Sequence, residues 1–152
     1  MRTSPGGALT LPDNPDDGEI RALLERVRRI AVVGLSPKAH RDSHRVSAYM
    51  QRAGYEIVPI YPREDLILGE RVYRSVRDIE SPVDLVNVFR RAEDLPEVAA
   101  DILESPHKNA PPVWFQYDCV NSEAIDALMR AGRMVVYDRC LMVEHGRLLR
   151  PR

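Results

Sequence analysis

The chain has 152 residues, which is the size of one domain and too short for two ordinary ones. Apolar residues make up 44% and charged residues 30%, a composition that excludes a wholly disordered chain. The 22 basic and 23 acidic side chains give a net charge of −1, so we expect no general binding to nucleic acids or membranes. No apolar run approaches the roughly 18–20 residues of a membrane span, and no basic-then-apolar pattern occurs near residue 1, so we expect neither a membrane span nor a leader.

The two cysteines, Cys119 and Cys140, do not make a metal site by themselves and show no CxxC spacing. We therefore expect a cytoplasmic protein with reduced thiols and no bound metal. Only Lys38 and Lys108 among the basic residues are lysines, so any anion site should be built mainly with guanidinium groups.

The first helix is predicted to follow a flexible segment. Residues 1–15 are rich in Pro and Gly and show no hydrophobic periodicity, so we predict a flexible tail there and a single domain over residues 16–152. Asp16 and Asp17 suit a helix start. Apolar residues then recur at helical spacing and predict a helix to about residue 28.

Short apolar runs predict five strands, at residues 30–34, 55–60, 83–89, 113–115 and 134–137. Helices are expected between them, at residues 43–54 with Ser43 as the cap, 94–104, and 121–132 with Asn121 as the cap. Residues 69–80 predict one short helical turn at best, and residues 141–152 a turn or a short strand. Pro59 is unfavourable inside the second strand because proline lacks the N–H that a sheet ladder needs.

The alternation of strand and helix, with short joints, is typical of an α/β protein. We predict a Rossmann-like, doubly wound and mainly parallel sheet of about five strands in the order 3-2-1-4-5, with helices on both faces. Ligands in such sheets bind beyond the carboxyl ends of the strands, beside the first strand. This directs attention to residues 34–43, 61–63, 89–91 and 116–117.

The loop after the first strand combines features that suit a phosphate group. Residues 34–39 occupy the place of a G-x-G-x-x-G motif but keep only its first glycine. Gly34 allows a tight turn, and the small Ser36 leaves room for a diphosphate. Cations and hydroxyls stand ahead of the next helix, namely Lys38, Arg41 and Ser43. A purely structural turn is the alternative.

The residues at the ends of the next two predicted strands limit which ligands are expected. The second strand ends in Tyr61-Pro62-Arg63, without the acidic residue that an NAD site places on the ribose. The arginine favours a ribose that carries a phosphate, as in NADP or coenzyme A (CoA), and the residues do not choose between these two. At the end of the third strand, Phe89 suits a purine and Arg90 a phosphate, unless Phe89 is core and Arg90 faces water.

Five stretches stand out when they are taken together and in order: IAVVGLS (30–36), RDS (41–43), GYEIVPIYP (54–62), VDLVNVFR (83–90) and DRCLMVEH (138–145). They resemble the small stand-alone CoA-binding domain family, which is similar to the N-terminal domain of the succinyl-CoA synthetase α subunit. The resemblance covers the chain from about residue 16 to its end. It implies a Rossmann-like fold that holds CoA, or a short acyl-CoA, across the carboxyl ends of the strands.

The resemblance also implies a set of binding residues. It places the amides of Gly34, Leu35 and Ser36 along the diphosphate, with side-chain contacts from Lys38, Arg41 and Ser43. It sets Ile60, Tyr61 and Pro62 beside the nucleotide, Arg63 near the ribose phosphate, Val88, Phe89 and Arg90 as a wall, and Gln116 near the thiol-bearing arm. Tyr61 and Tyr117 depart from the family, which commonly has Asn and Gly there, and both narrow the expected groove.

Three functions remain open from the sequence. The first is a CoA-binding domain without catalysis of its own, acting with a partner protein or as a homodimer. The second is an NADP-dependent oxidoreductase, although no proton donor is evident. The third is a Rossmann-like scaffold that acts through protein contacts. We name no catalytic residue: Cys140 beside Arg139 is the most reactive-looking group, but free cysteines are commonly buried.

Overall fold

Five parallel strands form the centre of the molecule in the computed structural model, which describes residues 11–149. They are β1 (Arg29–Val33), β2 (Glu56–Ile60), β5 (Leu85–Val88), β6 (Val113–Phe115) and β7 (Val135–Val136), in the order β2-β1-β5-β6-β7. All four pairings between them are parallel. The predicted α/β class and Rossmann-like sheet are confirmed.

The strand order differs from the predicted 3-2-1-4-5. The second strand, β2, is an edge strand, and the third predicted strand, β5, pairs directly with β1. Pro59 supplies the physical reason, because proline is tolerated at a sheet edge but would interrupt hydrogen bonding in an interior strand. On the outer side of β2, the Pro59 carbonyl accepts a hydrogen bond from the Tyr73 amide at 2.9 Å, and this contact needs no N–H from the proline. The order in which strands are added reverses between β1 and β5, so the switch point still lies beside the first strand.

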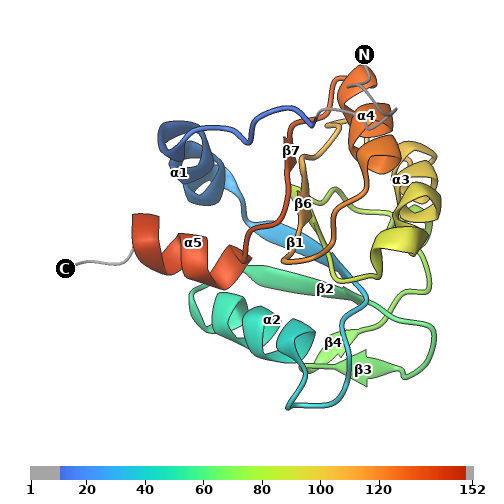
Figure 1. Ribbon diagram of the computed structural model, residues 1–152. Coiled ribbons are helices and arrows are strands. Elements are labelled where there is room, and N and C mark those ends of the chain that lie inside the picture. Colours follow the sequence, from blue (N-terminus) through green and yellow to red (C-terminus); the bar gives the residue numbers. More distant parts are fainter. Residues whose placement is uncertain (1–10, 150–152) are drawn as a thin grey trace.

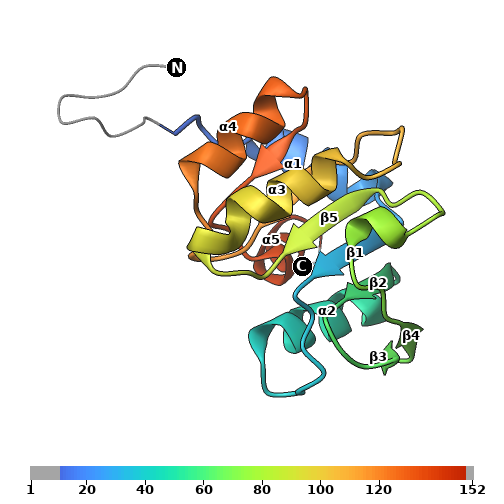
Figure 2. The same ribbon diagram turned by 90° about the vertical axis from the view of Figure 1, so that its right-hand side faces the viewer.

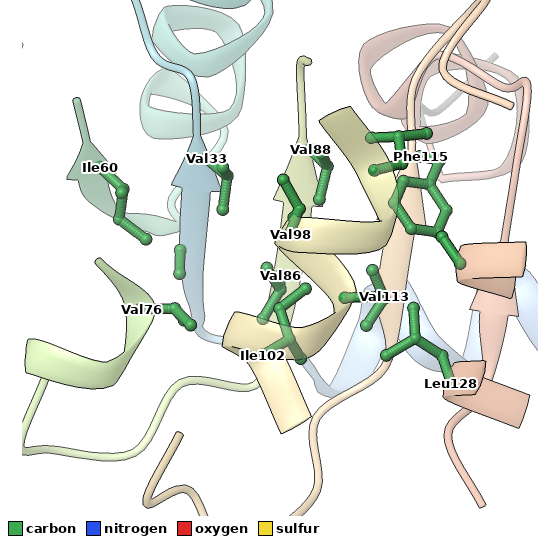
Figure 3. Close-up of a cluster of buried hydrophobic side chains, with 14 of the residues drawn as sticks. Val33, Ile60, Val76, Val86, Val88, Val98, Ile102, Val113, Phe115 and Leu128 are labelled. Atoms are coloured by element: carbon green, nitrogen blue, oxygen red, sulfur yellow. The ribbon is translucent and has the colours of Figure 1, made fainter. Parts of the chain in front are cut away.

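Helices cover both faces of the sheet (Figures 1 and 2). One face carries α1 (Asp17–Arg26), α2 (Asp42–Arg52) and α5 (Leu141–Leu148), and the other carries α3 (Leu95–Leu103), α4 (Ser122–Arg130) and the 3₁₀ turn η1 (Val76–Asp78). Successive strand residues alternate between the two cores, so Val32 packs on the α2 side and Val33 on the α3 side. Figure 3 shows the core on the α3 side. Burial on both faces explains why the strands are continuous apolar runs.

Two of the three helix caps predicted from the sequence are confirmed. Asp16 forms a capping box with Glu19 at the start of α1, and the Asn121 side chain accepts from the Ala124 amide at 3.0 Å at the start of α4. Ser43 does not cap α2. That helix has Arg41 at its N-cap position and no side-chain capping bond, whereas Ser43 lies within its first turn.

Two segments have structure that the sequence pattern did not predict. β3 (Leu66–Ile67) and β4 (Glu70–Arg71) form a small antiparallel hairpin after β2. The segment after Cys140 is a helix, α5, and not a turn or short strand. Its buried Glu144 accepts from Arg147 at 2.8 Å, and Arg147 also pairs with Asp17 on α1 at 2.7 Å. These contacts hold α5 against a helix some 130 positions away in sequence, so no local pattern indicates them.

The predicted flexible tail lies mostly outside the described residues, which begin at residue 11. The end of that segment is attached to the domain. The Asn14 side chain exchanges two hydrogen bonds with the Tyr137 backbone, at 2.8 and 3.0 Å, and the Tyr137 hydroxyl donates to the Pro12 carbonyl at 2.6 Å. Among residues 11–149, no helix combines the length and apolar character that crossing a bilayer requires.

Candidate functional site

A groove of about 1090 Å³ opens at the carboxyl ends of β1, β2 and β5. Its walls come from the β1–α2 loop, the segment after β2, η1 and one side of α3. Its floor is apolar and consists of Val33, Ile60, Val76, Phe89, Val98 and Ile102. A concave surface with an apolar floor and a polar rim is typical of a small-molecule site.

Gly34 sets how closely the ends of β1 and β5 approach. Its φ is +84°, a conformation that L side chains rarely adopt. A Cβ atom at this position would lie only 2.2 Å from the Phe89 carbonyl oxygen. The amides of Gly34 and Leu35 both donate to the Ile60 carbonyl, at 2.9 and 3.3 Å, which joins the loop to the end of β2. Gly34 is therefore required by close backbone packing as well as by the turn.

Internal hydrogen bonds also hold the rest of the loop. The Ser36 amide donates to Ser43 Oγ at 3.0 Å, and the Lys38 amide donates to Ser36 Oγ at 3.1 Å. His44 Nδ1 lies 2.9 Å from the Ser36 carbonyl, a contact that requires the proton on Nδ1. The amides of Gly34, Leu35 and Ser36 thus already donate to protein acceptors. The groups left for an anion are side chains and the uncapped start of α2.

Three lysine and arginine side chains on the groove rim make no ion pair and no side-chain hydrogen bond with any of residues 11–149. They are Lys38, Arg41 and Arg63, and all three are exposed. The Arg63 guanidinium lies 5.6 Å from the centroid of the Tyr61 ring, a cation–π arrangement. Unpaired cations on a concave surface favour the binding of an anion.

Among the other charged residues of the groove, all but Arg74 and Glu97 have a partner of opposite charge. Arg90 meets Asp94 at 3.2 Å, and Arg91 meets the same carboxylate at 3.1 Å. The hydrogen bond from Arg91 lowers the pKa of Asp94 below its ordinary value, so this carboxylate is ionised at neutral pH. Glu97, one turn further along α3, makes no ion pair or side-chain hydrogen bond with any residue in the range 11–149.

The segment after β2 and η1 complete the groove with polar contacts. Asp101 on α3 accepts from Ser75 Oγ at 2.5 Å and pairs with Arg77 at 2.8 Å. Arg74 donates to three backbone carbonyls of the turn after β2, at 3.2, 3.0 and 2.9 Å. These bonds tie the turn that carries Arg63 to the rest of the groove wall.

Most of the site residues predicted from the sequence line this groove, namely Gly34, Ser36, Lys38, Arg41, Ser43, Ile60, Tyr61, Pro62, Arg63, Phe89 and Arg90. Leu35, Val88 and Gln116 do not. Leu35 and Val88 are fully buried in the two cores. Gln116 is 3% exposed and donates to Asn87 Oδ1 at 2.9 Å within the sheet. Phe89 has both of its expected environments, because it lines the groove and packs against the core.

The wall made by α3 and η1 was not predicted from the sequence. Ser75, Arg77, Glu97 and Asp101 line the groove and were not among the predicted residues. A signal was present, since carboxylates recur at position 94, which is the N-cap of α3, and at positions 97 and 101 within the helix, beside its apolar face. Residues three and four apart share one side of a helix, so acids at this spacing border that face.

The two cysteines are free thiols, buried, and absent from the groove lining. Burial raises the pKa of the Cys119 thiol above its ordinary value, which disfavours the reactive thiolate. Cys140 lies at the N-cap position of α5 and is 6% exposed. Within the part of the chain that the structure describes, no three His, Cys, Asp or Glu residues gather in a way that could hold a metal ion.

Fold and groove together define a Rossmann-like domain with a cation-rimmed groove at the carboxyl ends of its strands. Comparison with known proteins identifies the kind of domain: residues 28–146 match the family described as CoA binding domain. The chain therefore belongs to the CoA binding domain family.

Individual relatives agree in size and fold. The uncharacterized protein YneT of Bacillus subtilis (strain 168) is 48% identical over 133 residues, which cover 88% of this chain and 96% of YneT. A hypothetical protein from Pyrococcus horikoshii OT3 is 36% identical with a TM-score of 0.85, covering 93% of this chain and 98% of that one. The apo acetyl-coenzyme A synthetase 1 of Ca. Korarchaeum cryptofilum shares the fold alone, at 19% identity and a TM-score of 0.59 over 70% of this chain and 25% of that one.

Proposed function

We propose that this chain binds coenzyme A, or a short acyl-CoA, in the groove at the carboxyl ends of β1, β2 and β5, without catalysis of its own. The observation that carries the proposal is the set of unpaired cations, Lys38, Arg41 and Arg63, around an apolar floor in a member of the CoA binding domain family. CoA offers matching chemistry, because it joins a diphosphate and a ribose phosphate to a planar base. A scaffold that acts only through protein contacts gives no reason for unpaired cations in a groove.

The diphosphate is assigned to the β1–α2 loop. Because the amides of Gly34, Leu35 and Ser36 donate within the protein, the contacts fall to Lys38, Arg41 and the start of α2. That helix start has no side-chain cap, and its dipole adds partial positive charge at this point. Gly34 and Ser36 then act by shaping the loop, and the side chains supply the charge.

The ribose phosphate is assigned to Arg63. This residue follows β2, where an NAD site would carry an acid, and Arg74 fixes the turn on which it stands. Arg63 alone would suit the 2′-phosphate of NADP as well as the 3′-phosphate of CoA. Membership of the CoA binding domain family favours CoA. We assign no catalytic side chain, and we propose that a partner protein or a second copy of the chain supplies any chemistry on the acyl group.

The proposal is tested by thermal unfolding of the purified protein with CoA, acetyl-CoA, dephospho-CoA, NADP or NAD. A ligand present at about 100 times its Kd adds about 2.7 kcal/mol, which raises the Tm of a domain this size by about 5–10 °C. We expect such a rise with CoA and acetyl-CoA and a smaller one with dephospho-CoA. A rise with NADP alone would refute CoA binding, and no rise with any ligand would support the scaffold.

The role of Arg63 has its own test. Arg63→Ala should weaken CoA by about tenfold, roughly the low end for a hydrogen bond to a charged group, and leave dephospho-CoA unchanged. Arg52→Ala is the matched control, since Arg52 is an exposed arginine outside the groove. Equal losses for the two ligands would remove Arg63 from the phosphate site.

A further inference from the structure

We propose that Glu97 on α3 is a specificity residue that selects the adenine base of CoA, by accepting a hydrogen bond from the exocyclic amino group of adenine. This inference rests on the proposed function, because it assigns the direction in which CoA lies along the groove. It places the phosphate groups near the β1–α2 loop and the base near α3.

Unpaired cations and carboxylates lie in different parts of the groove, and this separation sets the direction in which CoA lies. The unpaired cations Lys38 and Arg41 belong to the β1–α2 loop, and Arg63 belongs to the turn after β2. At the α3 end the cations are neutralised, because Arg90 pairs with Asp94 and Arg77 pairs with Asp101. A phosphate therefore gains most near the loop, whereas an anion near α3 would meet carboxylates.

Apolar side chains line the groove at the α3 end and expose only a few per cent of their surface to it. Val98 and Ile102 from α3 and Val76 from η1 line the groove, and their side chains gather on the same face of the sheet (Figure 3). Each of these three side chains is largely buried, so only a narrow apolar surface faces the groove. A planar base covers such a surface while keeping its polar edge at the rim.

Glu97 differs from the other acids on this wall. Asp94 and Asp101 are committed to arginines, and Asp101 also accepts from Ser75. Glu97 lines the groove with its carboxylate unpaired among residues 11–149. An ionised carboxylate only accepts hydrogen bonds, so it favours the amino group of adenine and opposes the carbonyl oxygen of hypoxanthine or guanine.

The test compares CoA with its hypoxanthine analogue, deamino-CoA, by isothermal titration. We expect the native protein to bind CoA about tenfold more tightly than deamino-CoA, roughly the value of one partly exposed hydrogen bond to a charged group. Glu97→Gln should bring the two affinities within about twofold, because an amide both accepts from an amino group and donates to a carbonyl. Glu123→Gln is the matched control: Glu123 is exposed at the start of α4, outside the groove, and should leave the tenfold preference unchanged.

A ligand without a base separates reading of the base from a general change in charge. 4′-Phosphopantetheine should bind the native protein and Glu97→Gln equally. Equal binding of CoA and deamino-CoA by the native protein would overturn the role of Glu97 and leave CoA binding intact. The same factor of change for CoA, deamino-CoA and phosphopantetheine in Glu97→Gln would also overturn it. Absence of CoA binding by the native protein would instead refute the proposed function itself.

Discussion

Replacing Gly34 by alanine tests the tightest backbone contact in the groove. The new Cβ would lie 2.2 Å from the Phe89 carbonyl oxygen, where real Cβ contacts are essentially never closer than 3.0 Å. The ends of β1 and β5 must therefore separate by about 1 Å. The perturbed atoms are backbone, so no side-chain rotation relieves the clash.

The magnitude follows from two separate costs. A non-glycine residue in the left-handed region costs about 1–2 kcal/mol, and overpacking a well-filled site costs about 1–3 kcal/mol. Gly34→Ala should then lose about 2–5 kcal/mol of unfolding free energy. Gly132→Ala is the matched control, because Gly132 has the same φ of +84° and a Cβ there would have nothing within 4 Å of it. That variant should lose only the first of the two costs.

Thermal and urea unfolding of the two variants isolate the clash. Gly34→Ala should melt about 2–12 °C below Gly132→Ala, since the overpacking cost of about 1–3 kcal/mol shifts the Tm of a domain of this size by about 2–4 °C per kcal/mol. CoA affinity should fall in Gly34→Ala and stay unchanged in Gly132→Ala. Equal losses of stability in the two variants would show that β1 and β5 tolerate the extra atom and would refute the close-packing argument.

Three further predictions concern single contacts. Ser43→Ala leaves the Ser36 amide without its acceptor, so it should lower the free energy of unfolding in urea by about 1 kcal/mol. It should also lower the affinity for CoA measured by titration. An unchanged affinity would exclude a role of the loop shape in binding. Burial raises the pKa of Cys119, so at about pH 8 its reaction with an aromatic disulfide reagent should be far slower in the native protein than in denaturant, and equal rates would contradict this. The hydrogen bond from Arg147 holds the pKa of Asp17 below its ordinary value of 3.8, so the stability that this contact adds is full above about pH 4 and is lost as the pH falls further. In Arg147→Met the urea midpoint should therefore fall less steeply at acidic pH than in the native protein. An equally steep fall in both proteins would disprove the linkage.

The fold was largely predictable because its strands are buried on both faces. Continuous apolar runs located all five strands of the sheet, and helical periodicity located α1 to α4. The order of the strands was missed although Pro59 indicated an edge strand. The helix α5 could not be predicted locally, because its attachment depends on the contact of Arg147 with Asp17, at the other end of the chain.

The candidate site was predictable in its residue types but not in their pairing. Lys38 and Arg90 were both expected to meet the ligand, yet the structure leaves Lys38 unpaired and joins Arg90 to Asp94. The four-residue spacing of Arg90 and Asp94 is visible in the sequence, but only the turn leading into α3 brings these two charges together. Gln116 was also expected to lie near the ligand, but its side-chain amide donates a hydrogen bond to Asn87 inside the sheet. Residue chemistry thus identifies groups that can bind an anion, and packing decides which of them are free to do so. By that criterion the structure leaves Lys38, Arg41 and Arg63 free, whereas Arg90 beside α3 is held by Asp94.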